Sequence, residues 1–170
     1  ALAQMTAADL GGHAIKAALK GAGAPTVDEV VMGCVLPAGQ GQAPARQAGF
    51  KAGLGEEVPA TTINKMCGSG MKAAMIAFDQ IALGESDVVV AGGMESMTNA
   101  PYMLPKMRSG ARLGHNQVID HMFLDGQSKP RKAGRLTTKL RIWMRPHPKA
   151  MYISPPTNNL ARHVPIKFPF

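Results

Sequence analysis

The chain has 170 residues, and 45% of them are hydrophobic, which is enough for the core of one ordinary domain. Its net charge of +8 comes from one end, because residues 1–126 carry nine Lys and Arg against eleven Asp and Glu, whereas residues 127–170 carry ten Lys and Arg and no acid. No apolar run is as long as a membrane span or a signal-peptide core, so we expect a cytoplasmic protein with no membrane contact.

The first predicted element is a helix from Thr6 to about Lys20. Thr6 followed three residues later by Asp9 is typical of a capping box, in which each side chain bonds to the other residue's amide. His13 lies inside this helix without a partner in the pattern. We therefore interpret His13 as a structural or surface histidine rather than a ligand or base.

Residues 29–36 form a near-continuous apolar run, which predicts a strand covered on both faces. Cys34 lies inside this run and is most simply a small core residue. The glycine-containing connection at 39–42 lacks the Gly-Lys-Ser/Thr ending of a phosphate-binding loop, so we assign it no ligand. A second helix is predicted over residues 43–52.

A β-branched run at residues 61–66 predicts the next strand, which leads directly to Cys67. A helical pattern follows as far as Gly84. One stripe of this helix consists of Met71, Met75, Phe78 and Ala82, and the opposite face is small and apolar, with Ala73, Ala74 and Ala77. Because both faces are apolar, the pattern predicts a helix buried on most sides. Residues 87–91 then predict another buried strand.

Helices and strands therefore alternate along the chain. Such alternation predicts an α/β fold, a mostly parallel sheet joined by helical crossovers with helices on both faces. Cys34 and Cys67 belong to different predicted strands, and we do not expect them to pair.

Cys67 lies where a strand turns into a helix. The first amides of a helix have no internal partner and carry partial positive charge, so a thiolate is favoured there and the same amides can stabilise an oxyanion. A thiolate at such a position can attack an acyl carbonyl. The residues alone leave a second interpretation open, an inert cysteine buried in the core.

Several motifs carry a resemblance to a known family. Ile63–Ala73 (INKMCGSGMKA) and Val88–Tyr102 (VVVAGGMESMTNAPY) closely resemble the N-terminal half of the thiolases, with bacterial acetyl-CoA acetyltransferases nearest. The segments 40–48 and 104–126 also resemble that family. The resemblance thus spans residues 1–126, with several motifs in the expected order.

The resemblance implies half of a thiolase-like fold, with an N-terminal α/β half over residues 1–99 and the start of a loop domain over 100–126. It implies a further strand before Ala1. It also implies that Cys67 is the catalytic nucleophile, which takes the acyl group from acyl-CoA as a thioester. The substrates would be coenzyme A thioesters, with no cofactor and no metal, and the parent enzyme would be a homo-oligomer.

The resemblance places the other catalytic groups in a second half. A histidine in a Gly-His-Pro motif, a second cysteine in a Cys-x-Gly-Gly-Gly motif and an Asn-Glu-Ala-Phe motif belong there. His147 precedes Pro148, but Pro146 stands in place of the glycine, and we treat this pair as coincidence. We expect very low turnover from this chain alone, because catalytic groups that act as a unit fail together.

Residues 127–170 depart from the family. This segment is basic and rich in proline, and two interpretations compete: a disordered arm that contacts polyanions such as nucleic acid, or translation in a wrong reading frame after Gly126. The cations before it, Lys106, Arg108 and Arg112, receive no role.

The predicted function is that of an acetyl-CoA C-acetyltransferase of fatty acid metabolism, which condenses two acetyl-CoA molecules reversibly to acetoacetyl-CoA and CoA. Four alternatives stay open: a ketoacyl-synthase-like condensing enzyme, a non-catalytic fragment, a binding module built on the basic tail, and a half-subunit that needs a partner.

Overall fold

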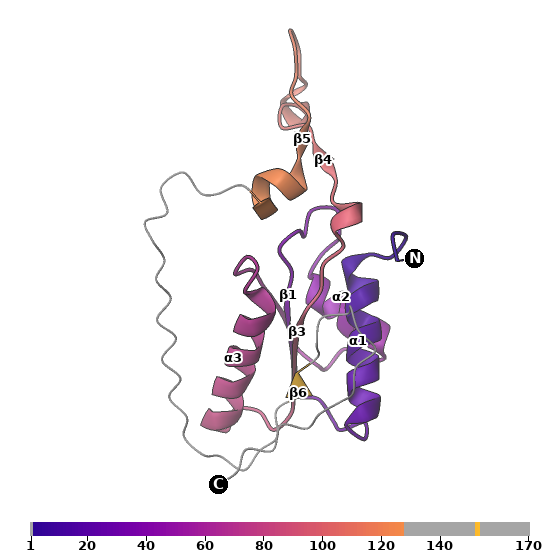
Figure 1. The fold of residues 1–170 in the computed structure, drawn as a ribbon, viewed down its shortest axis with the longest axis vertical. Coiled ribbons are helices and arrows are strands. Elements are labelled where there is room, and N and C mark those ends of the chain that lie inside the picture. Colours follow the sequence, from indigo (N-terminus) through magenta and orange to yellow (C-terminus); the bar gives the residue numbers. More distant parts are fainter. Residues whose placement is uncertain (1, 128–151, 154–170) are drawn as a thin grey trace.

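A computed structural model of the chain describes residues 2–127 and 152–153, and it contains a four-stranded parallel sheet (Figure 1). The strands lie in the order β2-β1-β3-β6. They are β1 (Glu29–Gly33), β2 (Ala60–Ile63), β3 (Val89–Gly93) and β6 (Tyr152–Ile153). The predicted parallel sheet is confirmed.

Three helices cover the two faces of the sheet. They are α1 (Ala7–Gly21), α2 (Pro44–Ala52) and α3 (Ser69–Leu83). Figure 1 shows α1 and α2 on one side of the strands and α3 on the other. Successive side chains of a strand point to opposite faces, so Val30 and Met32 pack with α1 and α2, while Val31 packs with α3. The predicted α/β fold is therefore confirmed, with a separate core on each face.

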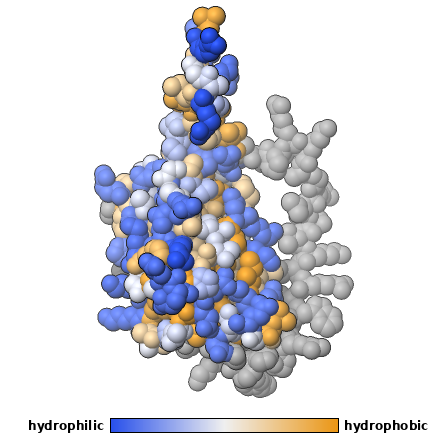
Figure 2. Space-filling model, turned by 180° about the vertical axis from the view of Figure 1, so that it is seen from behind, coloured by the Kyte–Doolittle hydropathy of each residue, from blue (hydrophilic) through white to orange (hydrophobic). Residues whose placement is uncertain are grey.

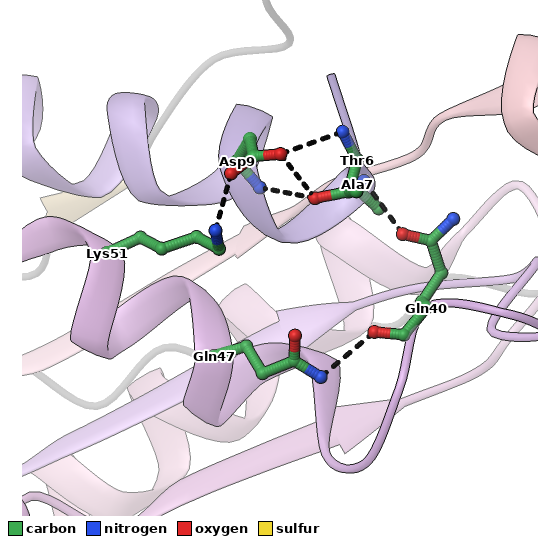
Figure 3. A network of polar contacts seen from close by, with 6 residues as sticks. All are labelled: Thr6, Ala7, Asp9, Gln40, Gln47 and Lys51. Carbon is green, nitrogen blue, oxygen red and sulfur yellow. Dashed lines mark hydrogen bonds and ion pairs between the residues drawn. The ribbon is translucent and has the colours of Figure 1, made fainter. Parts of the chain in front are cut away.

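The start of α1 is fixed as the capping box predicts. Asp9 N–H donates to Thr6 Oγ1 at 3.1 Å, and Thr6 N–H donates to Asp9 Oδ2 at 3.0 Å. Lys51 of α2 reaches the other Asp9 oxygen at 2.6 Å (Figure 3). The hydrogen bond from Lys51 and those from Thr6 lower the pKa of Asp9 well below its usual range. His13 is exposed, as expected for a surface histidine.

Two glutamines tie the connection after β1 to these helices (Figure 3). The buried Gln40 accepts the Ala7 amide on its Oε1 at 2.9 Å, and so satisfies one of the unpaired donors at the start of α1. Gln47 of α2 donates through Nε2 to the carbonyls of Gln40 at 2.9 Å and Gln42 at 2.7 Å. Side-chain amides therefore order this loop.

α3 is buried on one face and not on most sides. Its core face consists of Ala73, Ala77 and Ile81, whereas Met71 is 68% exposed and Met75 44% exposed. The small alanines face the sheet because they allow the helix axis to come close to it. The expectation of a helix buried on most sides is wrong for this chain, and Figure 2 shows apolar surface on the side of the body where α3 lies.

After β3 the chain leaves the sheet at its carboxyl end and forms an extension (Figure 1). The extension contains η1 (Met97–Asn99), β4 (Tyr102–Met103), η2 (Met107–Ser109), β5 (Ile119–Asp120) and η3 (Met122–Gln127). β4 and β5 pair antiparallel. The buried His121 anchors the base of this hairpin, since its amide donates to the Pro101 carbonyl and its Nδ1 lies 2.6 Å from Asp125.

Among the helices of the described residues, none has both the length and the apolar character needed to cross a membrane.

Candidate active site

Cys67 lies in the turn between β2 and α3, at the carboxyl end of the sheet. The predicted sequence of strand, turn and helix is confirmed, although β2 ends at Ile63, so residues 64–66 form part of the turn and not of the strand. Cys67 is an exposed residue and forms no disulfide. The alternative of a cysteine buried in the core is therefore excluded.

Two polar side chains hold the turn in place. Asn64 Oδ1 accepts the Met66 amide at 3.0 Å, which closes a local turn of the kind that asparagine favours. Ser69, which is buried, accepts the Lys65 amide on Oγ at 2.9 Å and donates the same hydroxyl to the Met66 carbonyl at 2.6 Å. The backbone of the two residues before Cys67 is thus held by hydrogen bonds from a side chain that precedes it and from one that follows Cys67.

The residue before Cys67 has a strained backbone. Met66 has a φ of +49°, in the left-handed region that residues other than glycine rarely adopt. Strain of this kind persists only where surrounding contacts enforce it, and it concentrates at functional sites. Here the hydrogen bonds of Asn64 and Ser69 enforce it, and the consequence is a sharp turn that presents Cys67 at the surface.

Three glycines let the first turn of α3 approach the ends of β1 and β3. A Cβ on Gly33 would lie 2.5 Å from the Ser69 Cβ and 2.9 Å from the Gly70 nitrogen, so only glycine fits there without movement. A Cβ on Gly93 would lie 3.3 Å from the Gly70 Cα. The helix start beside Cys67 is therefore seated directly on the sheet.

The amides around Cys67 are partly used within the turn. Gly68 N–H donates to Lys65 O at 3.1 Å and Ser69 N–H donates to Met66 O at 3.0 Å. The first turn of α3 has neither a side-chain cap nor an acidic residue. The partial positive charge of the helix start is therefore not compensated by a carboxylate of its own first turn.

Glu95 holds the chain that follows β1, a role that the sequence did not predict. Its carboxylate accepts the amides of Val35 at 2.8 Å and Leu36 at 2.9 Å, and so it joins the end of β3 to the chain after β1. These amides bond to a side chain and not to another strand, which is why β1 ends at Gly33 and not at residue 36. A carboxylate two residues after a buried strand that ends in a Gly-Gly pair was the available signal.

Cys34 lies in the core, as predicted, and both cysteines are free. Its Sγ donates to a Glu95 oxygen at 3.6 Å. Burial, and then the nearby Glu95 charge, raise the pKa of the Cys34 thiol to about 12. Cys34 therefore stays protonated near neutral pH.

The remaining residues considered in the sequence analysis lie either on the extension after β3 or outside the described residues. Lys106, Arg108 and Arg112 are exposed on the extension after β3. His147 and nearly all of the basic tail lie outside the described residues. Within residues 2–127 and 152–153, no group of three or more His, Cys, Asp and Glu side chains is arranged to hold a metal ion.

Comparison with known proteins adds a family and named relatives. Residues 1–138 match the family described as thiolase, N-terminal domain. An acetyl-CoA acetyltransferase of Cupriavidus necator is 54% identical over 127 residues, and one of Candida albicans is 52% identical over 128. Acetyl-CoA acetyltransferase 1 of Arabidopsis thaliana is 54% identical over 127 residues. These matches cover 74% of this chain but only 31–32% of each relative, so the chain spans about a third of their length.

Proposed function

Because this chain belongs to the thiolase family by its N-terminal domain, we propose that it carries the acyl-accepting half of an acetyl-CoA acetyltransferase site, with Cys67 as the nucleophile. The observation that carries this proposal is the turn itself. Cys67 is an exposed cysteine on a strained strand-to-helix turn, and the side chains of Asn64 and Ser69 hold this turn by hydrogen bonds. The turn lies at the carboxyl end of a parallel sheet, which is the end where α/β folds place their ligands.

In the proposed first step, the Cys67 thiolate attacks the carbonyl carbon of acetyl-CoA. The C–S bond to coenzyme A then breaks, the CoA thiolate leaves and takes up a proton, and an acetyl thioester remains on Cys67. The positive end of α3 and the Cys67 amide are the groups proposed to stabilise the oxyanion of the intermediate.

In the second step, the deprotonated methyl carbon of another acetyl-CoA attacks that thioester. The products are acetoacetyl-CoA and the regenerated Cys67 thiolate, and the reverse sequence is thiolysis. The proton transfers need an acid–base group, and the family resemblance assigns it to a second half. We therefore propose that this chain by itself accepts acetyl groups slowly and turns over little.

The proposed substrates, cellular setting and oligomeric state rest on the relationship to the thiolase family. The substrates are coenzyme A thioesters with no further cofactor, the setting is fatty acid metabolism in the cytoplasm, and the parent enzyme is a homo-oligomer. The relatives are named as acetyl-CoA acetyltransferases, which supports the acetyl group as the acyl unit.

The test is acetylation of the intact 170-residue chain by acetyl-CoA, followed by peptide mass spectrometry. We expect one acetyl group on the peptide that contains Cys67, removable by added coenzyme A, and none on Cys34. Cys67→Ala should abolish the modification, whereas Cys34→Ala should leave it. Equal acetylation of both cysteines, or acetylation that persists in Cys67→Ala, would overturn the assignment of Cys67.

A further inference from the structure

The carboxylate of Glu95 binds three consecutive residues of the chain after β1. Its Oε2 accepts the Val35 amide at 2.8 Å, and its Oε1 accepts the Leu36 amide at 2.9 Å and the Cys34 thiol at 3.6 Å. Hydrogen bonds to an ionised acceptor are about twice as strong as those between neutral groups. Within residues 2–127 and 152–153 no Lys or Arg forms an ion pair with this carboxylate. Glu95 therefore fixes the segment 34–36 relative to the end of β3.

The same segment contacts the end of β2 and the turn that follows it. The Cys34 amide donates to the Ile63 carbonyl at 3.0 Å. One residue further along, the Val35 carbonyl accepts Asn64 Nδ2 at 3.4 Å. Two hydrogen bonds from adjacent residues thus join the segment that Glu95 holds to the last residue of β2 and to the first residue of the turn.

Asn64 extends this connection to the residue beside the nucleophile. Its Nδ2 contacts the Val35 carbonyl, and its Oδ1 accepts the Met66 amide, whose residue has the left-handed φ of +49°. A strained conformation of this kind relaxes unless the surrounding contacts enforce it. The orientation of the Asn64 side chain therefore decides whether Met66 stays strained and whether the turn keeps presenting Cys67.

We propose that Glu95 is a positioning residue for the acetylation of Cys67. Glu95 acts through the segment 34–36 and then through Asn64, which together hold the turn in the conformation that brings Cys67 to the start of α3. This proposal rests on the proposed function, since acetylation of Cys67 is the step that Glu95 would assist. It gives the Glu95 carboxylate a role in the reaction without contact with the substrate.

The test compares Glu95→Gln with a matched control at the next residue. Glutamine has the same size, but it has one acceptor oxygen and a donor NH₂ group, so it cannot accept the Val35 and Leu36 amides on two separate oxygens. Ser96 is also buried after β3, but its hydroxyl donates to the Met5 carbonyl at 2.7 Å, in the segment before α1. Ser96→Ala therefore removes a hydrogen bond at the same end of the sheet without changing the contacts of the segment 34–36.

The measurement is the single-turnover rate of Cys67 acetylation in the intact 170-residue chain, as a function of acetyl-CoA concentration. In Glu95→Gln we expect the maximal rate to fall roughly tenfold, while the concentration that gives half of this rate changes by less than about twofold, because Glu95 does not bind the substrate. In Ser96→Ala both quantities should equal those of the wild type. An unchanged maximal rate in Glu95→Gln, or an equal fall in Ser96→Ala, would overturn the proposal.

Hydrogen exchange separates a failure of this proposal from a failure of the proposed function. The Lys65 amide, which donates to Ser69 Oγ, reports on the turn, and the Val30 amide, which donates to the Pro59 carbonyl at 3.0 Å, reports on the sheet. In Glu95→Gln we expect exchange at Lys65 to become at least about fivefold faster while Val30 stays slow. If Cys67 takes no acetyl group even in the wild type, the proposed function fails, and exchange at Lys65 alone decides whether Glu95 holds the turn.

A second variant covers the case in which Glu95→Gln does not fold. Asn64→Ser lies on the exposed turn and keeps a local acceptor for the Met66 amide, but its shorter side chain does not reach the Val35 carbonyl. We expect its maximal acetylation rate to fall at least about threefold. A rate equal to that of the wild type would show that the connection through Asn64 does not position Cys67, and so would contradict the proposal.

Discussion

The two cysteines of this chain both follow a strand of the same parallel sheet, yet they lie in opposite environments. Cys34 comes directly after β1, is 1% exposed and contacts the Glu95 carboxylate. Cys67 comes after β2 in a turn, is exposed and precedes the positive end of α3. The chain that follows the strand therefore decides whether a thiol is a core residue or a candidate nucleophile.

The largest expected effect is a difference in alkylation rate between these two thiols. With a pKa of about 12, only about one Cys34 in ten thousand is ionised at pH 8, and the side chain is buried as well. We expect iodoacetamide to modify Cys67 at least about a hundredfold faster than Cys34, as followed by peptide mass spectrometry. In denaturant the two rates should converge. Comparable rates in the folded chain would remove the contrast between the two sites.

The second prediction concerns the close contact between the end of β1 and the first turn of α3. In Gly33→Ala the new Cβ meets the Ser69 and Gly70 backbone, which belongs to the turn beside Cys67 and is not the end of a flexible side chain. We expect the free energy of unfolding to fall by about 2–3 kcal/mol and Cys67 alkylation to change rate, because the turn must shift. Urea unfolding and labelling measure these two effects.

Gly49→Ala is the matched control for this substitution. Gly49 lies inside α2, and the nearest atom to an added Cβ there is 3.8 Å away, which is ordinary contact. Alanine favours a helix over glycine, so stability should be unchanged or rise by up to about 1 kcal/mol. Similar losses in both variants would mean that Gly33 is not specially required.

The order of the helices and strands and the positions of the two cysteines follow from the sequence. The buried face of α3 and the role of Glu95 do not, and each has a physical reason. The alternation of elements and the capping box at Thr6 predict correctly because they depend on local patterns. The prediction that α3 is buried on most sides was wrong, since Met71 and Ala73 lie on different faces and are both apolar, and periodicity does not say which of two apolar faces meets the sheet. Glu95 was missed because its partners, Val35 and Leu36, are distant in the sequence.

The third prediction concerns the hydroxyl that fixes the turn. Ser69→Ala removes one group that both accepts the Lys65 amide and donates to the Met66 carbonyl. We expect a loss of about 1–2 kcal/mol in the free energy of unfolding, because the Lys65 amide loses its acceptor and the Met66 carbonyl keeps only the Ser69 amide as a donor. Ser69→Thr keeps the hydroxyl and serves as the comparison, and Cys34 should stay unreactive in both. An unchanged stability in Ser69→Ala would show that Ser69 does not hold the turn.

The smallest predicted effect is an alkaline loss of stability that belongs to Cys34 alone. Its folded pKa of about 12 lies above the ordinary value of 9.0, so the folded state holds the proton more tightly than the unfolded state does. The resulting stabilisation is fully present below pH 9 and is lost as the pH rises toward 12. Between pH 9 and pH 10 the wild type should lose about 1 kcal/mol more than Cys34→Ala, which lacks the thiol.

Urea titrations at each pH measure this difference, and Cys67→Ala provides the control. Its substitution lies on the exposed turn, so it leaves the buried thiol and the Glu95 contact in place and should retain the alkaline slope of the wild type. If instead Cys34→Ala and the wild type lose stability in parallel, the Cys34 proton is not held by the fold. In that case burial alone, and not its ionisation, would separate the two cysteines.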